Sequence, residues 1–377
     1  MNPRPALPRT ARWALGLWAL ALTLRLAAAG SPGAVESLYA RGLYPHVAAA
    51  LGTLTGWAPF SVAELLVALA AVGALVRGYR ARGALLRRPR RPALQRLGLL
   101  AAAAAGAGYL AFLLVWGLNY HRSPLAQLAG YGGEPPEPEA AAAELRELCT
   151  LLVDEVADLR GAVGEDAAGV MRLRAGRRDA LGRAGQGYAA AAAQSPTLAA
   201  VLAPSGAPPK PALASRAMSL VGISGIYFPF TGEPHVNAEL PACQLPFVAC
   251  HEIAHRLGFA REDEANFLAW LACRDHPDAD FRYAGALAAL RHALAVLALV
   301  DPAAFAVERE RLAEPVLRDL RDLEAFWSRW RGPLAELGSA VNDAYLTAQG
   351  ELEGVASYGR VVDLLLAERR WRARRGD

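Results

Sequence analysis

The sequence predicts a mainly α-helical fold of α+β type, in which three N-terminal membrane helices precede a mostly helical domain with a short β element. Two observations support this prediction. The first 120 residues contain three apolar runs, each of about the length that crosses a bilayer. The rest of the chain has helical periodicity, interrupted by one stretch that is typical of strands.

The three apolar runs are each flanked by polar or turn residues, and we expect residues 1–120 to be a membrane anchor inserted in the lipid bilayer. The first run contains Arg25 and ends in small residues, a pattern that is also typical of a cleavable signal peptide. Both interpretations of that run remain open. The runs cover residues 13–29, 60–76 and 97–118.

Arginine is unevenly distributed around these runs. Eight Arg lie between the second and third runs and three precede the first. The loop between the first and second runs contains only two charged residues, Glu36 and Arg41. By the positive-inside rule, the N-terminus and the Arg-rich loop are cytoplasmic. We therefore expect a multi-pass bacterial cell-membrane protein whose C-terminal part is extracytoplasmic.

The net charge argues against a nucleic-acid partner. Residues 1–120 contain 13 Arg and two Glu but no Lys or Asp, which is a net charge of +11. Because the whole chain carries +4, residues 121–377 carry −7. A nucleic-acid-binding domain needs basic charge on its folded part, so we expect no nucleic acid as partner.

The C-terminal part divides into a linker and one large domain. Residues 121–138 are rich in Gly and Pro and predict the linker, and residues 139–377 form the domain. Its first helix is expected over residues 139–160, and one or two short strands over 221–230. The apolar run 284–300 carries Arg291 and His292 at its middle, so we predict a buried helix there instead of a membrane span.

The motif HExxH at residues 251–255 predicts the chemistry of this domain. On a helix, His251 and His255 lie on one face and can both ligate one Zn²⁺ ion. Glu252 then stands beside the metal and can act as the general base, which is the arrangement of a zinc peptidase. The motif therefore predicts a zincin-like domain, against the alternative of a helix with two incidental histidines.

A catalytic zinc site needs a third protein ligand, and the acidic segment after Gly258 supplies the candidates. At 100° per residue, Glu262 lies on one stripe with small residues that can pack against the HExxH helix, so it is the expected ligand. Glu264 is the reserve ligand, because the start of a helix is uncertain by a residue or two. Asn266, one turn after Glu262, is the candidate to hydrogen-bond a ligating histidine.

All four cysteines fall in the part of the chain that is expected to be extracytoplasmic, where disulfides persist. Up to two disulfides are therefore allowed, and the sequence does not choose among the three pairings. The cysteines are Cys149, Cys243, Cys250 and Cys273.

Several segments together resemble a family of bacterial membrane proteins that is known only as a domain of unknown function. The resemblance spans nearly the whole chain and implies three membrane helices followed by an HExxH domain. A local similarity to the gluzincin zinc peptidases covers Glu262 to Asn266, with Asn in place of the usual Asp and a shorter spacing from His255. The segments that carry the family resemblance are residues 56–66, 116–122, 225–230, 251–268 and 354–358.

The expected function is therefore that of a membrane-anchored zinc metallopeptidase acting outside the cytoplasm. Its substrate would be a peptide, a protein or a peptidoglycan stem, and neither the choice among them nor the oligomeric state follows from the sequence. The alternative is a binding or sensor protein that keeps zinc without turnover. An intramembrane protease is disfavoured, because Arg256 and Arg261 flank the motif.

Overall fold

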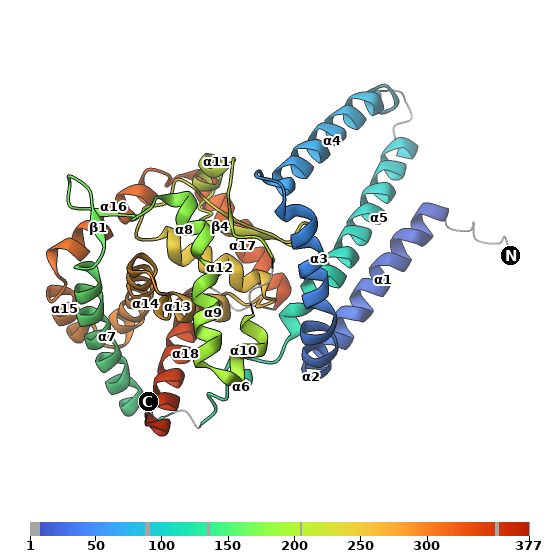
Figure 1. Cartoon of the computed structure of the whole chain (residues 1–377). Helices are drawn as coiled ribbons and strands as arrows, with labels where there is room; N and C mark the ends of the chain where they lie inside the picture. Colours follow the sequence, from blue (N-terminus) through green and yellow to red (C-terminus); the bar gives the residue numbers. More distant parts are fainter. Residues whose placement is uncertain (1–7, 87–90, 134–135, 204–205, 351–353, 377) are drawn as a thin grey trace. The chain divides into compact units, whose positions relative to one another are not determined.

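The computed structural model of the protein describes residues 8–86, 91–133, 136–203, 206–350 and 354–376 (Figure 1). The chain folds into two compact units. Unit 1 comprises residues 1–47 and 62–122, and unit 2 comprises residues 48–61 and 123–377. Part of the predicted Arg-rich loop, with Arg87, Arg88 and Arg90, lies outside the described residues.

Unit 1 is helical. Helices α1 and α5 pack along one another, and the Trp18 indole N–H donates to the carbonyl of Ala102 at 3.0 Å. The segment between the first two apolar runs, predicted to be a loop, is also helical. The elements are α1 (Arg9–Ala29), α2 (Pro32–Ala34), the π-helix η1 (Val35–Leu43), α3 (Tyr44–Gly56, which ends in unit 2), α4 (Val62–Leu86), α5 (Arg91–Val115) and the 3₁₀ helix η2 (Gly117–His121).

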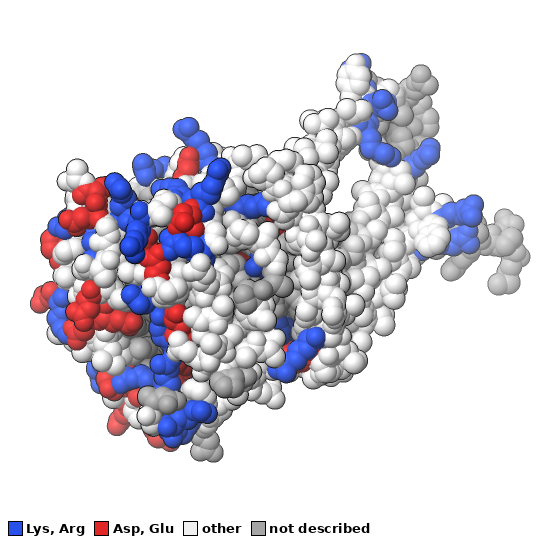
Figure 2. All heavy atoms as spheres, viewed as in Figure 1, with Lys and Arg blue, Asp and Glu red and all other residues white. Residues whose placement is uncertain are grey.

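Three helices of unit 1 are long and apolar enough to cross a membrane, which agrees with a membrane protein. The spans are Arg9–Ala29, Val62–Arg80 and Leu94–Val115. In the view of Figure 2 these helices show uncharged surface along most of their length, with Arg at their ends. Charged side chains of both signs gather instead on unit 2 in the same view.

Unit 2 is mainly α-helical, as predicted, with two small sheets. Its elements are α6 (Leu125–Leu128), α7 (Pro138–Arg160), β1 (Gly164–Glu165), β2 (Met171–Arg172), α8 (Arg177–Arg183), α9 (Gly185–Gln194), α10 (Pro196–Leu202), β3 (Lys210–Pro211), α11 (Ser215–Leu220), β4 (Gly225–Phe228), β5 (Glu233–Val236), α12 (Leu245–Arg256), α13 (Glu262–Arg274), α14 (Ala279–Val300), α15 (Pro302–Glu310), α16 (Glu314–Ser328), α17 (Pro333–Gln349) and α18 (Gly354–Arg375).

The predicted β stretch contains one strand, β4, and the structure adds β3 and β5. In the three-stranded sheet, β5 lies in the middle, parallel to β3 and antiparallel to β4. Strand β4 is therefore an edge strand, with Ile226 opposite His235 and Phe228 opposite Glu233. Helix α12 contacts both β4 and β5.

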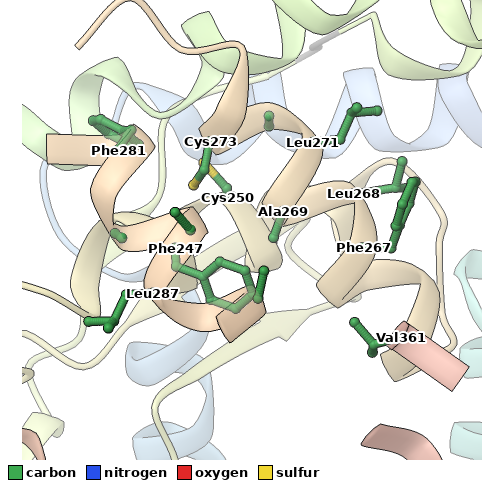
Figure 3. Packing of buried hydrophobic residues seen from close by; sticks show 14 of the residues in the cluster. Phe247, Cys250, Phe267, Leu268, Ala269, Leu271, Cys273, Phe281, Leu287 and Val361 are labelled. Carbon is green, nitrogen blue, oxygen red and sulfur yellow. The ribbon is translucent and has the colours of Figure 1, made fainter. Parts of the chain in front are cut away.

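Helix α13 lies at the centre of the hydrophobic core, in contact with α9, α12, α14 and α18. Its packing against α12 uses small side chains, because Cys250 on α12 lies beside Cys273 on α13, and both are completely buried, as is Ala269 on α13 (Figure 3). Small residues let two helix backbones approach closely. The stripe predicted to face the HExxH helix is thus buried at Ala265, Ala269, Ala272 and Cys273.

The apolar helix α14 satisfies the length and composition of a membrane span, but 61% of its apolar window is buried within the protein, against 6–22% for the three spans of unit 1. Phe281, Leu287 and Leu297 on this helix are buried in the core. The prediction of a buried helix is confirmed. The high hydropathy of α14 follows from its contacts with α7, α13 and α18.

A buried carboxylate joins four elements around this core. Asp319 on α16 is completely buried and accepts hydrogen bonds from the Arg160 guanidinium at 2.6 Å, the Met171 amide at 2.7 Å and the Tyr283 hydroxyl at 2.6 Å. The donors come from α7, β2 and α14. A buried charge with a full set of donors fixes the relative positions of the elements that supply them.

A second polar cluster joins residues 48–61 to the three-stranded sheet within unit 2. The Lys210 ammonium contacts Glu233 at 2.6 Å and donates to the carbonyls of Thr55 and Phe60, both at 2.9 Å. The Ser61 hydroxyl lies 2.7 Å from Nε2 of His235. These side chains are buried, so the segment before α4 is an integral part of unit 2.

All four cysteines are free and buried, so neither of the two disulfides that the sequence allowed is formed. Cys250 and Cys273 lie side by side between α12 and α13 (Figure 3). They act there as small apolar residues in the helix contact.

Candidate metal centre

Helix α12 carries the HExxH motif through the core. It begins with Leu245 and Pro246, and a proline is compatible with the first turn of a helix because the amide groups there have no partner within the helix. Every residue of α12 is buried except His251, which is partly exposed. The motif is therefore held rigidly, and its first histidine faces the accessible side of the helix.

The turn after α12 orients the second histidine. Gly258 adopts a φ of +85°, which ends the helix, and the amide of Phe259 donates to the carbonyl of Ala254 at 3.1 Å. With the Gly258 amide bonded to the carbonyl of His255 at 3.0 Å, this is a Schellman motif. The same turn places the Phe259 carbonyl 2.8 Å from Nδ1 of His255, which leaves Nε2 of that ring to face outward from the turn.

Glu262, the first residue of α13, meets both histidines. Its carboxylate oxygens lie 3.3 Å from Nε2 of His251 and 3.5 Å from Nε2 of His255, and all three groups lie within 4.8 Å of one another. Zinc bonds of about 2.0–2.2 Å in tetrahedral geometry would separate neighbouring ligand atoms by about 3.3 Å. The two imidazoles and one carboxylate therefore match in type and spacing a three-ligand zinc site with one open position.

The charges of these groups are strongly coupled. Burial alone would lower the pKa of His255, but the neighbouring Glu262 outweighs it and raises the pKa to about 9. Burial alone would raise the pKa of Glu262, but the two histidines hold it well below its ordinary value. The three side chains thus form a site that favours positive charge on the imidazole side, and a divalent cation would take the place of the protons.

Glu252 lies next to strand β4 and interacts electrostatically with His251, His255 and Glu262. It is 3% exposed, receives a hydrogen bond from the backbone of Tyr227, and its Oε2 has no partner among the described residues. A Cβ at Gly225 would overlap the Glu252 carboxylate, so only glycine leaves this group its present position. Burial raises the pKa of Glu252 to about 7, although the two histidines of the motif oppose the shift.

A cavity of about 460 Å³ is lined by two of the three candidate ligands, His251 and Glu262. Seven of its fifteen lining residues are polar or charged and eight are apolar, so the cavity offers both kinds of surface to a ligand. Helix α14 supplies both apolar residues and the pair Arg291 and His292. The lining residues are Ser224, Cys243, Gln244, Phe247, Val248, His251, Glu262, Asn266, Ala284, Leu287, Ala288, Arg291, His292, Ala295 and Leu323.

The structure places the two remaining candidates away from the ligand position. Asn266 lines the cavity next to Glu262, but no hydrogen bond from it to either histidine is present in the described part of the chain. Glu264 is 5% exposed and points elsewhere, accepting from the Leu125 amide at 2.7 Å and pairing with Arg261 at 2.7 Å. The His251, Glu262 and His255 cluster therefore forms without the reserve ligand.

Several residues of the site were not predicted from the sequence. The Phe259 carbonyl and Gly225 act through backbone geometry, which residue type alone does not indicate. Arg291 and His292 had served only as evidence against a membrane span. The presence of Arg291 and His292 within the apolar run 284–300 is the signal that could have indicated this role, because charged groups in the middle of an otherwise apolar helix need a polar or open surrounding.

Fold and site together define a mainly α-helical protein with membrane-compatible helices and a His-His-Glu cluster beside a cavity. The family described as "Protein of unknown function (DUF3810)" matches residues 39–366, and the chain belongs to this family. The match includes the whole described site and two of the three apolar helices of unit 1. No curated protein and no solved structure matches the chain.

Glu264 has a structural role that can be tested separately from the metal site. We expect Glu264→Ala to lower the free energy of unfolding by about 2 kcal/mol, because the Leu125 amide would be buried without an acceptor. Glu264→Gln keeps an acceptor oxygen, so its free energy of unfolding should fall by less than half of the loss expected for Glu264→Ala. Denaturant unfolding of the full chain in detergent measures both, and an alanine variant as stable as the parent protein would contradict this role.

Proposed function

We propose that the protein is a membrane-anchored, zinc-dependent metallopeptidase that hydrolyses peptide or amide bonds outside the cytoplasm. The observation that carries the proposal is the convergence of His251, His255 and Glu262 at the spacing of a tetrahedral zinc site. Glu252 projects from the same helix and is available as the base. His251 and Glu262 line a cavity large enough for part of a peptide.

The proposed ligands are Nε2 of His251, Nε2 of His255 and the carboxylate of Glu262. Two imidazoles and one carboxylate suit zinc, and three protein ligands leave the open position that distinguishes catalytic from structural sites. Zinc held by these residues would supply Lewis-acid chemistry for a substrate carbonyl and a water molecule. The Phe259 carbonyl keeps the proton of His255 on Nδ1, so that Nε2 can act as a ligand.

The role proposed for Glu252 is to accept a proton from the attacking water and to return it to the leaving amine. Its Oε2 has no hydrogen-bond partner among the described residues, so this oxygen is available for the transfer. Gly225 leaves room for the carboxylate. The edge strand β4, to which Gly225 belongs, can pair with an extended peptide, and this would bring the substrate backbone alongside the base.

The metal assignment predicts which variants lose zinc. The purified full chain should hold about one zinc per molecule, and His251→Ala, His255→Ala and Glu262→Ala should each lose most of it, since two remaining ligands hold zinc weakly. Glu264→Gln is the matched control, because it changes a nearby carboxylate that makes other contacts. Elemental analysis after dialysis measures the metal, and undiminished zinc in the three ligand variants would reject the assignment.

The same preparations test catalysis. Glu252→Gln should keep its zinc but lose roughly 10²- to 10⁴-fold in hydrolysis rate, because the amide cannot accept a proton. A tryptic digest of casein analysed by mass spectrometry offers many peptide bonds at once. If zinc is bound but neither protein cleaves any peptide, the result favours the alternative of a non-catalytic zinc-containing binding or sensor protein.

The space beside Glu252 gives a further test of its role. Gly225→Ala should keep the metal while lowering the rate by about 100-fold, the scale expected when a catalytic group is displaced by about 1 Å. Gly185→Ala is the control, because a Cβ added there meets nothing within 4 Å. Rate and zinc content measured together separate the two effects. Full activity in Gly225→Ala would place the base elsewhere.

The proposed location outside the cytoplasm is based on the Arg asymmetry of the loops around the apolar helices. Alkaline phosphatase, which folds to an active form only outside the cytoplasm, should be active when fused after Asp377 and inactive when inserted near Pro89. The reverse pattern would place the His-His-Glu cluster in the cytoplasm. Equal expression of the two fusions, checked by immunoblot, is the control.

A further inference from the structure

The charge of the cavity beside the metal centre is carried mainly by one residue. Arg291 projects from α14 at the cavity wall and is exposed. Among the lining residues Glu262 is the only carboxylate, and it is committed to the two histidines of the motif. The cavity therefore has one positively charged lining residue, Arg291, in addition to the Glu262 carboxylate.

Arg291 differs from three other arginines of unit 2, which pair with carboxylates. Arg160 is paired with Asp319, Arg261 with Glu264 and Arg274 with Asp275. No described residue forms an ion pair or hydrogen bond with the Arg291 side chain. An arginine that is held on a buried helix, directed to a cavity and left without an internal partner is available for a ligand.

We propose that Arg291 binds a carboxylate of the substrate and so selects peptides that present a free carboxylate next to an apolar side chain. The inference rests on the proposed peptidase function and names its substrate class. The planar guanidinium offers two parallel N–H donors, which match a carboxylate. Phe247, Val248 and Leu287 line the same cavity and provide the apolar surface for the adjacent side chain.

The rest of the lining favours an anionic group at Arg291 over a neutral one. Gln244, Ser224 and Asn266 are neutral, and burial, helped by the nearby Arg291 charge, lowers the pKa of His292 to about 4, so that this ring is uncharged at neutral pH. No described carboxylate other than Glu262 competes for Arg291 in the cavity. Because Arg291 is exposed, water and salt weaken the pair, and we expect a preference of about tenfold.

Binding tests this inference without requiring turnover. Glu252→Gln protein is titrated calorimetrically with N-acetyl-leucyl-leucine and with its C-terminal amide. The acid should bind about tenfold more tightly, and the added change Arg291→Ala should abolish the difference. Arg291→Lys keeps the positive charge but lacks the two parallel N–H donors of the guanidinium, so it should retain part of the preference for the acid. Arg309→Ala removes an exposed charge on α15 outside the cavity and is the control.

The carboxylate can come from the end of a chain or from a side chain, and a second pair of probes separates these sources. N-acetyl-glutamyl-leucinamide and its glutaminyl counterpart have no C-terminal carboxylate. Preference for the glutamyl compound assigns a side-chain carboxylate, whereas preference seen only with the first pair assigns a chain terminus.

The outcomes distinguish this inference from the proposed function. Equal binding of acids and amides, a preference that survives Arg291→Ala, or no binding of either acid at millimolar concentration would overturn the role of Arg291. A carboxylate preference that depends on Arg291 supports it even if the parent protein cleaves no peptide, in which case only the peptidase proposal fails. A melting temperature within about 2 °C of the parent shows that the variants are folded.

Discussion

The hydrogen bond between Nδ1 of His255 and the Phe259 carbonyl is the interaction on which the geometry of the site depends. It exists because Gly258 can take a left-handed conformation and close a Schellman motif. That turn sets both the direction of the His255 ring and the point where α13 can begin. Glu262 is the first residue of α13, so the ligand triad follows from the conformation of five linking residues.

The packing of α12 on α13 turns this local geometry into a rigid one. Completely buried alanines and cysteines line the contact, so neither helix can shift without losing close packing. The site itself contains elements that oppose folding, since Glu252 is buried with one oxygen unpartnered and His251 has an unpartnered Nδ1. Such groups persist only where the surrounding core is well packed, and they are most common at functional sites.

The features of the site that can be predicted from the sequence are those that are local along the chain. The helical period predicts that His251 and His255 lie on one face of α12. A count of 100° per residue along α13 predicts that Glu262, and not Glu264, faces them, and both predictions involve only two neighbouring helices. The relation of Arg291 to His251 could not be predicted, because 40 residues separate them and the packing of α14 decides it. The sequence indicates Glu264 only as a reserve ligand, because its contact with Leu125 depends on a segment more than 100 residues earlier.

The polar cluster around Lys210 changes how the chain is divided. From hydropathy the anchor ends near residue 120, yet Thr55, Phe60 and Ser61 belong to unit 2 by their hydrogen bonds. Without residues 48–61 the ammonium of Lys210 would lose two carbonyl acceptors, and His235 would lose its contact with Ser61. The unit that holds the His-His-Glu cluster is therefore built from two separate stretches of sequence, and the segment leading into α4 contributes to the stability of the sheet beside Glu252.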